Sequence, residues 1–408
     1  MYCLLQFCNN FTRNWKQDNN ELDLTARLFF TCAGKSVQHP QKSKLGGMKN
    51  ADSFILADSL IGVADGVSSV YLEGVDPSFL PTELLAKCAK NFNLRIEDPL
   101  KFDVQTHSQL ASFSILYDPQ EWYKHILTRS ATECKSLGST TCLLIMLDFD
   151  SLWTVNLGDS QMILLRKSES EPENNCTCAY HESIPNEVPT PYNCPTCCFS
   201  AFRHVRYGII HRSHSQQHYF NCPYQLTRMP DVDCTNSEIA SRIEELVQVQ
   251  RVKILPGDLL IAGTDGLFDN LFDDEISGIV NEVYFAIDPK TGFPGCHPQA
   301  IVDRLVEGAL KAGSYNTLLG KRKHTPFSQS ASLELKGEYI GGKPDDTTAV
   351  AAFISLRKGR NYRSLSFLSS LENADQHHNK LPVCTQSCVS SGKLEWVQNL
   401  FKSRMFSQ

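Results

Sequence analysis

The chain has 408 residues, 41% of them hydrophobic, which is enough apolar material for one large domain or two smaller ones. Its formal net charge of −6 argues against broad nucleic-acid binding, which needs a basic surface, so no nucleic-acid partner is expected. No stretch approaches the roughly 18 uninterrupted apolar residues of a membrane-spanning helix, so no transmembrane segment is expected either.

The sequence pattern predicts short strands, with helices gathered in blocks between them. In chain order, the predicted elements are strands at 54–56 and 60–64, helices at 81–89 and 119–136, strands at 140–147, 152–157 and 162–165, a strand pair within 251–263, helices at 273–285 and 297–312, and a strand at 348–355. Strict alternation of strands and helices is absent. The pattern therefore favours an α+β fold in which antiparallel sheets are flanked by helices.

Three segments lie outside this predicted core. Residues 1–26 form an N-terminal segment that carries Arg13 and Lys16 and is a candidate targeting sequence. A polar, turn-rich insertion covers about 168–203, and a tail rich in Ser, Asn, Gln and Lys covers 358–408. We expect the tail to be mostly disordered, which leaves 27–357 as the folded domain.

Cysteine is frequent, with sixteen residues. Several lie within apolar or helix-like segments, as at Cys88, Cys134 and Cys142, which favours buried thiols in a reducing compartment over a disulfide framework. The insertion offers one candidate zinc-ligand set: Cys176, Cys178, Cys194 and Cys197. The alternative is a flexible insertion with free thiols, because the Cys176–Cys178 spacing is not that of a usual zinc ribbon.

Three acidic turns, far apart in the chain, lie where strands are predicted to end. They are Asp65-Gly66, Asp265-Gly266 and Asp345-Asp346. Carboxylates at adjoining strand ends can converge on one point, where they repel each other unless cations lie between them. Hard oxygen ligands of this kind suit Mg²⁺ or Mn²⁺. The pattern therefore predicts a metal-dependent enzyme of phosphate chemistry.

Further motifs accompany these turns in a fixed order. They are Gly74-Val75-Asp76-Pro77-Ser78, Gly138-Ser139-Thr140-Thr141, Gly158-Asp159-Ser160, the phrases at 217–221 and 223–226, and Thr264-Asp265-Gly266-Leu267-Phe268-Asp269-Asn270. Together they resemble the PPM, or type 2C, family of metal-dependent serine/threonine phosphatases over about 27–356. The resemblance is to its mitochondrial-type subgroup, in which valine follows the first Asp-Gly, as Val67 does here.

The resemblance implies a four-layer αββα sandwich of two antiparallel sheets, with metal ions at one end. It implies that Asp65 bridges two ions and that the Gly66 carbonyl binds one of them. Asp265 and Asp345 would hold the other ion. The implied cofactors are two Mg²⁺ or Mn²⁺ ions per active site.

The resemblance also implies the reaction. Asp52 matches the acid that positions metal-bound water, so Asp52 and Asp65 are the predicted catalytic residues. Asp159 matches a residue linked to a weaker third metal in some relatives. Two ions lower the pKa of a bridging water, and the resulting hydroxide attacks phosphorus directly, without a covalent enzyme intermediate. The implied substrates are phosphoserine and phosphothreonine in proteins.

Departures from the family pattern surround Asp52 and Asp65. Ala51 stands where many relatives have a second acid, and shifting the alignment by one residue would place Ala51 in the water-positioning slot instead of Asp52. Ser68-Ser69 replace the usual pair of glycines, which predicts a strained loop if that loop needs positive φ. No clear candidate arginine for phosphate binding is found before Asp52, and Lys44 or Lys49 is the candidate replacement.

Besides a zinc-held interaction module attached to a phosphatase-like core, which the Cys-rich insertion would allow, two functional interpretations follow. The first is an active phosphatase with phosphoprotein substrates, expected to be a monomer. The second is a catalytically weak or inactive family member that binds phosphoproteins as a scaffold. A mitochondrial location is predicted from the subgroup resemblance, with the cytoplasm as the alternative.

Overall fold

In a computed structural model, the described residues are 27–43, 49–97, 118–169, 205–230, 235–284, 297–314 and 323–357. The chain divides into a unit of residues 1–368 and a unit of residues 369–408, and every described residue belongs to the first. The predicted N-terminal segment, the tail and nearly all of the Cys-rich insertion lie outside the described ranges, so the domain boundaries stay a prediction. Within those ranges, no helix has both the length and the apolar character needed to cross a bilayer.

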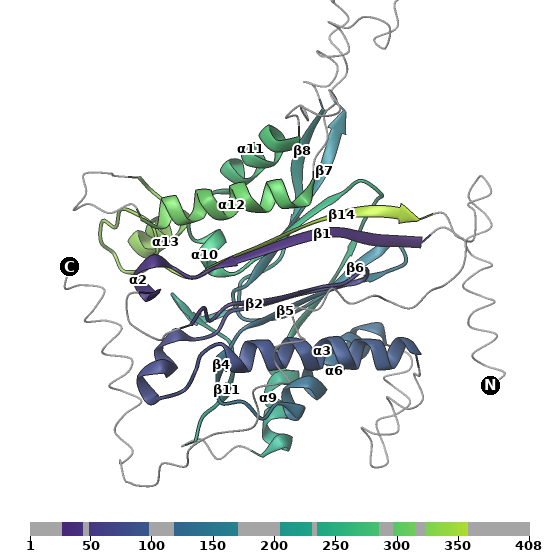
Figure 1. The fold of residues 1–408 in the computed structure, drawn as a ribbon, viewed down its shortest axis with the longest axis vertical. Helices are drawn as coiled ribbons and strands as arrows, with labels where there is room; N and C mark the ends of the chain where they lie inside the picture. The colour runs from purple at the N-terminus through teal and green to yellow at the C-terminus, as the bar shows by residue number, and fades with distance from the viewer. Residues whose placement is uncertain are drawn as a thin grey trace, which may run out of the picture. The chain divides into compact units, whose positions relative to one another are not determined.

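Two five-stranded antiparallel sheets stack face to face (Figure 1). The first sheet has the order β1 (Arg27–Val37), β14 (Thr347–Arg357), β13 (Leu259–Gly263), β7 (Gln161–Glu169) and β8 (Val205–Arg212). The second has the order β12 (Gln248–Lys253), β6 (Ser151–Leu157), β5 (Cys142–Asp148), β3 (Leu60–Ala64) and β2 (Ser53–Leu56). Two small ribbons pair β9 (Gln217–Tyr219) with β10 (Cys222–Pro223), and β11 (Leu226–Arg228) with β4 (Gly138–Thr140).

Helices cover the outer face of each sheet (Figure 1). The second sheet is covered by α3 (Phe79–Glu97), α6 (Pro119–Glu133) and α9 (Asn236–Leu246). The first is covered by α11 (Asp273–Tyr284) and α12 (Pro298–Gly313). The short helices are α2 (Pro40–Ser43), the 3₁₀ helix η1 (Ser68–Glu73), α10 (Asp265–Phe268) and α13 (Pro326–Glu334). This is the four-layer αββα sandwich that the sequence predicted.

The apolar runs of the central strands are continuous because both faces of these strands are buried. In β5, Leu143 and Ile145 face the core between the sheets, whereas Leu144 and Met146 face the helices. Strand β13 repeats this alternation with Leu260 between the sheets. The buried cysteines Cys88, Cys134 and Cys142 are free thiols in or beside the helix-covered core, as predicted.

Most predicted elements are present, with some differences. Both strands predicted within 251–263 are present, but the prediction that they pair with each other is wrong. Strand β12 joins β6 in one sheet, and β13 joins β7 and β14 in the other. The turn between them therefore crosses from sheet to sheet. The predicted strand 140–147 divides at Thr141 into β4 and β5. The sequence analysis missed β1, β8, α9 and α13.

Two of the acidic turns require glycine for close packing of the backbone. A Cβ atom on Gly66 would lie 2.5 Å from the carbonyl oxygen of Pro77 and 2.6 Å from that of Ala51. A Cβ atom on Gly266 would overlap the carbonyl oxygen of Asp346. These contacts bring the Asp265 turn against the Asp345-Asp346 turn.

We expect Gly266→Ala to lower the free energy of unfolding by roughly 1–3 kcal/mol or more, because backbone must move to admit the methyl group. Gly278→Ala is the matched control: Gly278 lies within α11 with open space around it. Alanine there should raise stability by about 0.5–1 kcal/mol. Urea denaturation of the two variants measures both effects, and equal stability of the two would contradict the packing argument.

Candidate active site

The structure brings the three acidic turns together at one end of the sandwich. Asp65 follows β3, and its backbone is fixed by Thr141, whose N–H donates to the Asp65 carbonyl (2.9 Å) and whose Oγ1 accepts from the Asp65 N–H (3.1 Å). Burial, and then repulsion from Asp265, Asp52 and Asp345, raises the pKa of Asp65 well above its ordinary value. The predicted metal ligands therefore share one electrostatic environment.

Asp52 links the two sheets. It precedes β2 of one sheet, and its Oδ2 accepts hydrogen bonds from the hydroxyls of Thr264 (2.8 Å) and Thr348 (2.7 Å), at the ends of β13 and β14 in the other. Its Oδ1 is buried and has no hydrogen-bond partner among the described residues. Burial, and then repulsion from Asp346, raises the pKa of Asp52 to about 8.

The neighbouring Ala51 has a different role. Its methyl group is fully buried, and its N–H donates to Asp346 Oδ2 at 3.0 Å. The carboxylate that reaches Asp65 electrostatically is that of Asp52. The water-positioning role of Asp52 stays a prediction, and its carboxylate, unlike the methyl group of Ala51, interacts electrostatically with Asp65.

Two lysines that the sequence analysis did not select lie among the carboxylates. Lys343 forms an ion pair with Asp265 and lies 3.2 Å from Asp269 Oδ2 and 3.5 Å from Asp345 Oδ2. Lys343 stands only two residues before Asp345 in sequence, and this proximity could have identified it as a site residue. Burial alone would lower the pKa of Lys343, but the neighbouring aspartates raise it well above its ordinary value.

Lys42 is the second of these lysines. Its Nζ lies 2.6 Å from Asp345 Oδ1 and 3.3 Å from Asp346 Oδ2, and it donates to Ser68 Oγ at 2.7 Å. Burial alone would raise the pKa of Asp345, but Lys343 and Lys42 together lower it below its usual value.

The carboxylate of Asp346 accepts hydrogen bonds from backbone amides, so it differs from the acids that bury an oxygen atom without a partner. Its Oδ1 accepts from the N–H of His39 (2.9 Å), and its Oδ2 accepts from that of Ala51 (3.0 Å). Both ends of the segment that joins β1 to β2 are thereby held at the site. The carboxylate is almost fully buried, so these bonds are shielded from water.

The predicted strain at Ser68-Ser69 is absent. Both residues lie in η1, and among the described residues the only non-glycine positive φ values are at Phe149, Asn221 and Lys336. The loop therefore does not need glycine at these two places. Ser68 instead supplies the hydroxyl that accepts from Lys42.

Of the two predicted phosphate ligands, Lys49 is described, and its ammonium group is paired outside the acidic cluster. Lys49 pairs with Asp76 at 2.8 Å, lies 4.9 Å from the centre of the Phe79 ring, and has a side chain that is 60% exposed. Lys44 lies outside the described residues, as do all four predicted zinc ligands. The zinc site therefore stays a prediction.

Asp159 lies between Asp65 and Asp265 in sequence, outside the three acidic turns, and it belongs to the same charged environment. Its Oδ2 accepts from Gln217 Nε2 at 2.8 Å, and its buried Oδ1 has no partner among the described residues. Burial, and then repulsion from Asp265, raises the pKa of Asp159 to about 7. Burial also raises the pKa of Asp269, to about 6, because burial and repulsion from Asp265 together outweigh the lowering by Lys343.

The donor chemistry of the cluster fits divalent cations. Its ligands are carboxylate oxygens, and Asp52, Asp159 and Asp265 each bury an Oδ1 atom without a hydrogen-bond partner among the described residues. Across the same residues, no group of three or more His, Cys, Asp or Glu side chains is arranged to hold a metal ion, and the ammonium groups of Lys42 and Lys343 lie against the carboxylates. Buried, unpaired oxygens that repel one another are the groups that Mg²⁺ or Mn²⁺ stabilises.

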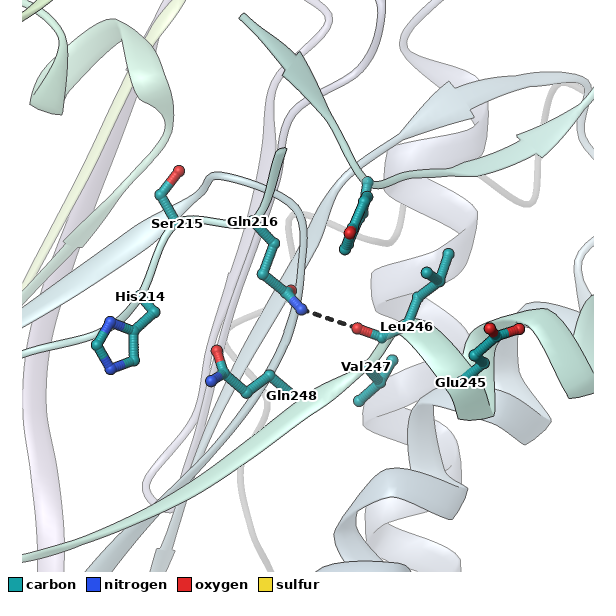
Figure 2. A pocket seen from close by; sticks show the side chains of 8 residues that line it. His214, Ser215, Gln216, Glu245, Leu246, Val247 and Gln248 are labelled. Carbon is teal, nitrogen blue, oxygen red and sulfur yellow. Dashed lines mark hydrogen bonds between the residues drawn. The ribbon is translucent and has the colours of Figure 1, made fainter. Parts of the chain in front are cut away.

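A separate pocket of about 510 Å³ lies at the base of the β9–β10 hairpin (Figure 2). Gln216 crosses it and donates from Nε2 to the carbonyl of Leu246, at the end of α9 (2.8 Å). The backbone N–H of Gln216 donates to the carbonyl of Gly158 (3.0 Å), next to Asp159. The lining contains none of the clustered aspartates, so this pocket is not the predicted metal site.

Comparisons with known proteins were made for the whole chain. A probable protein phosphatase 2C 55 of Arabidopsis thaliana is 28% identical over 323 residues, which cover 79% of this chain and 51% of that protein. The protein phosphatase PTC7 homolog fig of Drosophila mojavensis is 27% identical over 299 residues, which cover 72% of this chain and 74% of that protein. No family model matches the chain.

The structure is similar to that of the photosystem II phosphatase PBCP, with a TM-score of 0.52, 22% identity, and coverage of 80% of this chain and 99% of that one. The chain spans about half the length of the first of its curated relatives, 51% of the Arabidopsis protein. These similarities confirm the resemblance drawn from the motifs: the chain is similar in sequence to proteins named protein phosphatase 2C and PTC7 homolog, and similar in fold to PBCP.

The raised pKa of Asp52 predicts a pH-dependent stability. Its folded value is about 8 against an ordinary 3.8, so the fold favours the protonated form and loses stability as pH rises from about 4 to about 8. Asp52→Asn cannot ionise, yet it keeps an oxygen to accept from Thr264 and Thr348. In a chelator, we expect the variant to lose less stability than the wild type between pH 5 and pH 8, by roughly 1–3 kcal/mol. Urea denaturation at the two pH values measures this, and parallel profiles would contradict it.

Proposed function

We propose that this chain is a metal-dependent protein serine/threonine phosphatase that hydrolyses phosphoserine and phosphothreonine in phosphoprotein substrates. The observation that carries the proposal is the convergence of Asp52, Asp65, Asp265 and Asp345, from both sheets, on one buried site. The names of the sequence relatives, protein phosphatase 2C and PTC7 homolog, support the same reaction. The scaffold alternative has no use for buried carboxylates that repel one another.

The cofactors in this proposal are Mg²⁺ or Mn²⁺, two ions per site. Asp65, the Gly66 carbonyl, Asp265 and Asp345 would hold them, and Asp159 is the candidate ligand of a third. When bound, such ions supply a water molecule of lowered pKa as nucleophile and neutralise charge on the phosphoryl oxygens. Acidic groups that destabilise one another without cations are suited to this task.

The protein's own contribution to proton transfer falls to Asp52. Thr264 and Thr348 fix its Oδ2, and this leaves Oδ1 as the acceptor that faces the site. Without cations, burial raises the pKa of Asp52 to about 8, and cations bound beside it would favour its charged form, which accepts a hydrogen bond from the attacking water. We assign Asp52 the role of orienting that water.

Phosphate binding is assigned to Lys42. Among the described residues before Asp52, it is the lysine whose ammonium group lies within the cluster, whereas Lys49 is held at Asp76. Ser68 and Asp345 fix its direction from two sides. A point charge there can hold a phosphoryl oxygen, although without the two-pronged geometry of arginine.

The central test is phosphate release from a phosphothreonine peptide with Mn²⁺, Mg²⁺ or EDTA. We expect release with either metal, none with EDTA, and loss of at least about 100-fold in Asp265→Asn, because a metal ligand is removed. Asp274→Asn, an exposed carboxylate on α11, is the control and should retain activity. Absence of release with both metals from folded wild-type protein would favour the phosphoprotein-binding scaffold.

A second test separates the candidate phosphate ligands. Lys42→Met should lower kcat/KM by roughly 10–100-fold, the value of a lost charge-assisted hydrogen bond, whereas Lys49→Met should change it by less than about two-fold. Lys42→Arg keeps the charge and should recover part of the loss. Steady-state kinetics on one peptide suffice, and equal effects at Lys42 and Lys49 would contradict the assignment.

A mitochondrial location is also proposed, on the subgroup resemblance. The PTC7 homolog is the relative whose name supports that subgroup. Microscopy of the chain with a C-terminal fluorescent tag, with and without residues 1–26, distinguishes this location from the cytoplasm. Retention in the cytoplasm in both forms would contradict the proposal.

A further inference from the structure

The β9–β10 hairpin is fixed beside the acidic cluster by polar contacts at its base and its turn. Gln217 donates from Nε2 to Asp159 Oδ2 (2.8 Å), while its Oε1 accepts from the N–H of Asn221 (3.0 Å). Asn221 adopts a φ of 58°, the left-handed conformation that reverses the chain. The residue before this turn, Phe220, is thereby given a defined position.

Phe220 meets an aromatic ring from a distant part of the chain. Its ring centre lies 5.4 Å from that of Phe327, with the planes tilted by 35°. Phe327 is held at the start of α13, where its N–H donates to the carbonyl of Asp269 (2.9 Å) and where Thr325 caps the helix. Both positions are therefore set by backbone geometry, not only by contact between the two rings.

This aromatic pair borders the polar site. The ammonium group of Lys343, which contacts Asp265, lies 5.7 Å from the centre of the Phe327 ring. Both phenylalanines are only partly buried, and the adjacent Tyr219 is 57% exposed. Within the described residues, neither ring belongs to the three hydrophobic cores of the sandwich. Apolar surface of this kind, next to a polar centre, is suited to receive an apolar group from a ligand.

We propose that Phe220 and Phe327 form a subsite for a large apolar side chain next to the phosphorylated residue of a protein substrate. The inference rests on the proposed phosphatase function and specifies its substrates. The Lys343 ammonium contacts Asp265 of the acidic cluster and lies 5.7 Å from the centre of the Phe327 ring, so the aromatic pair borders the cluster at which the phosphorylated residue would be held. The subsite selects leucine, methionine or phenylalanine over glycine or an acidic residue.

The test uses two phosphothreonine peptides that differ only at the flanking positions, leucine in one and glycine in the other. We expect the wild type to hydrolyse the leucine peptide with a kcat/KM about ten-fold higher, which equals about 1.4 kcal/mol. Phe220→Ala and Phe327→Ala should each remove most of this preference and leave hydrolysis of the glycine peptide nearly unchanged. Because the two rings touch, the double variant should lose less than the sum of the single losses.

The matched control is Leu333→Ala, at a position that is 79% exposed on the same helix as Phe327 and that should keep the wild-type preference. Melting temperatures confirm that each variant is folded, and Phe327→Leu, which keeps apolar volume, should retain part of the preference. Equal losses on both peptides would overturn the proposal and show that the rings only hold the hairpin against α13. A wild type without preference would overturn it as well.

A failure of the proposed function is recognised separately. If the wild type hydrolyses neither peptide, fluorescence anisotropy with the same two peptides still measures the preference as a ratio of Kd values. Tighter binding of the leucine peptide, lost in Phe220→Ala, would support the subsite in a non-catalytic protein. Equal Kd values for the leucine and glycine peptides would contradict the proposed subsite.

Discussion

Mutual repulsion among buried carboxylates is the constraint on which this structure depends. Asp52, Asp65, Asp265 and Asp345 are drawn from both sheets to one end of the sandwich, where burial, and then repulsion from neighbouring aspartates, raises the pKa values of Asp52 and Asp65. The fold tolerates this because hydroxyls, backbone amides and two lysines surround the acids. The sheets are joined at the same place, through the bonds of Asp52 to Thr264 and Thr348. Catalytic geometry and sheet packing are therefore parts of one arrangement.

The acids and the proposed aromatic subsite recognise different parts of the substrate. The charged centre responds to the phosphoryl group, which is common to every phosphorylated serine or threonine. Phe220 and Phe327, from elements about 100 residues apart in the chain, respond to the surrounding sequence. A substitution in the aromatic pair should thus alter the choice of substrate without changing the chemistry.

The sequence predicted those parts of the site that depend on local pattern. Asp-Gly at the end of an apolar run identifies a strand end, and this was sufficient for Asp65 and Asp265. It was not sufficient for Lys42, which meets Asp345 across 303 residues of sequence and is locally indistinguishable from Lys49. The strand pair at 251–263 was misread for a similar reason, since neighbouring strands joined by a short turn usually share a sheet. Edge strand β1 was missed because few of its side chains are fully buried.

Asp346 has a consequence for how such a protein can diversify. By accepting from the amides of His39 and Ala51, it fixes both ends of the connection between the sheets at the site. The free energy of closing a loop rises only slowly with length once its ends are fixed, by about 0.6 kcal/mol for each doubling. We therefore expect insertions between these anchors to leave the aspartates in place, provided that Lys42 keeps its contacts with Asp345 and Ser68. A docking sequence for a partner could therefore be inserted into this connection, either in related proteins or by design.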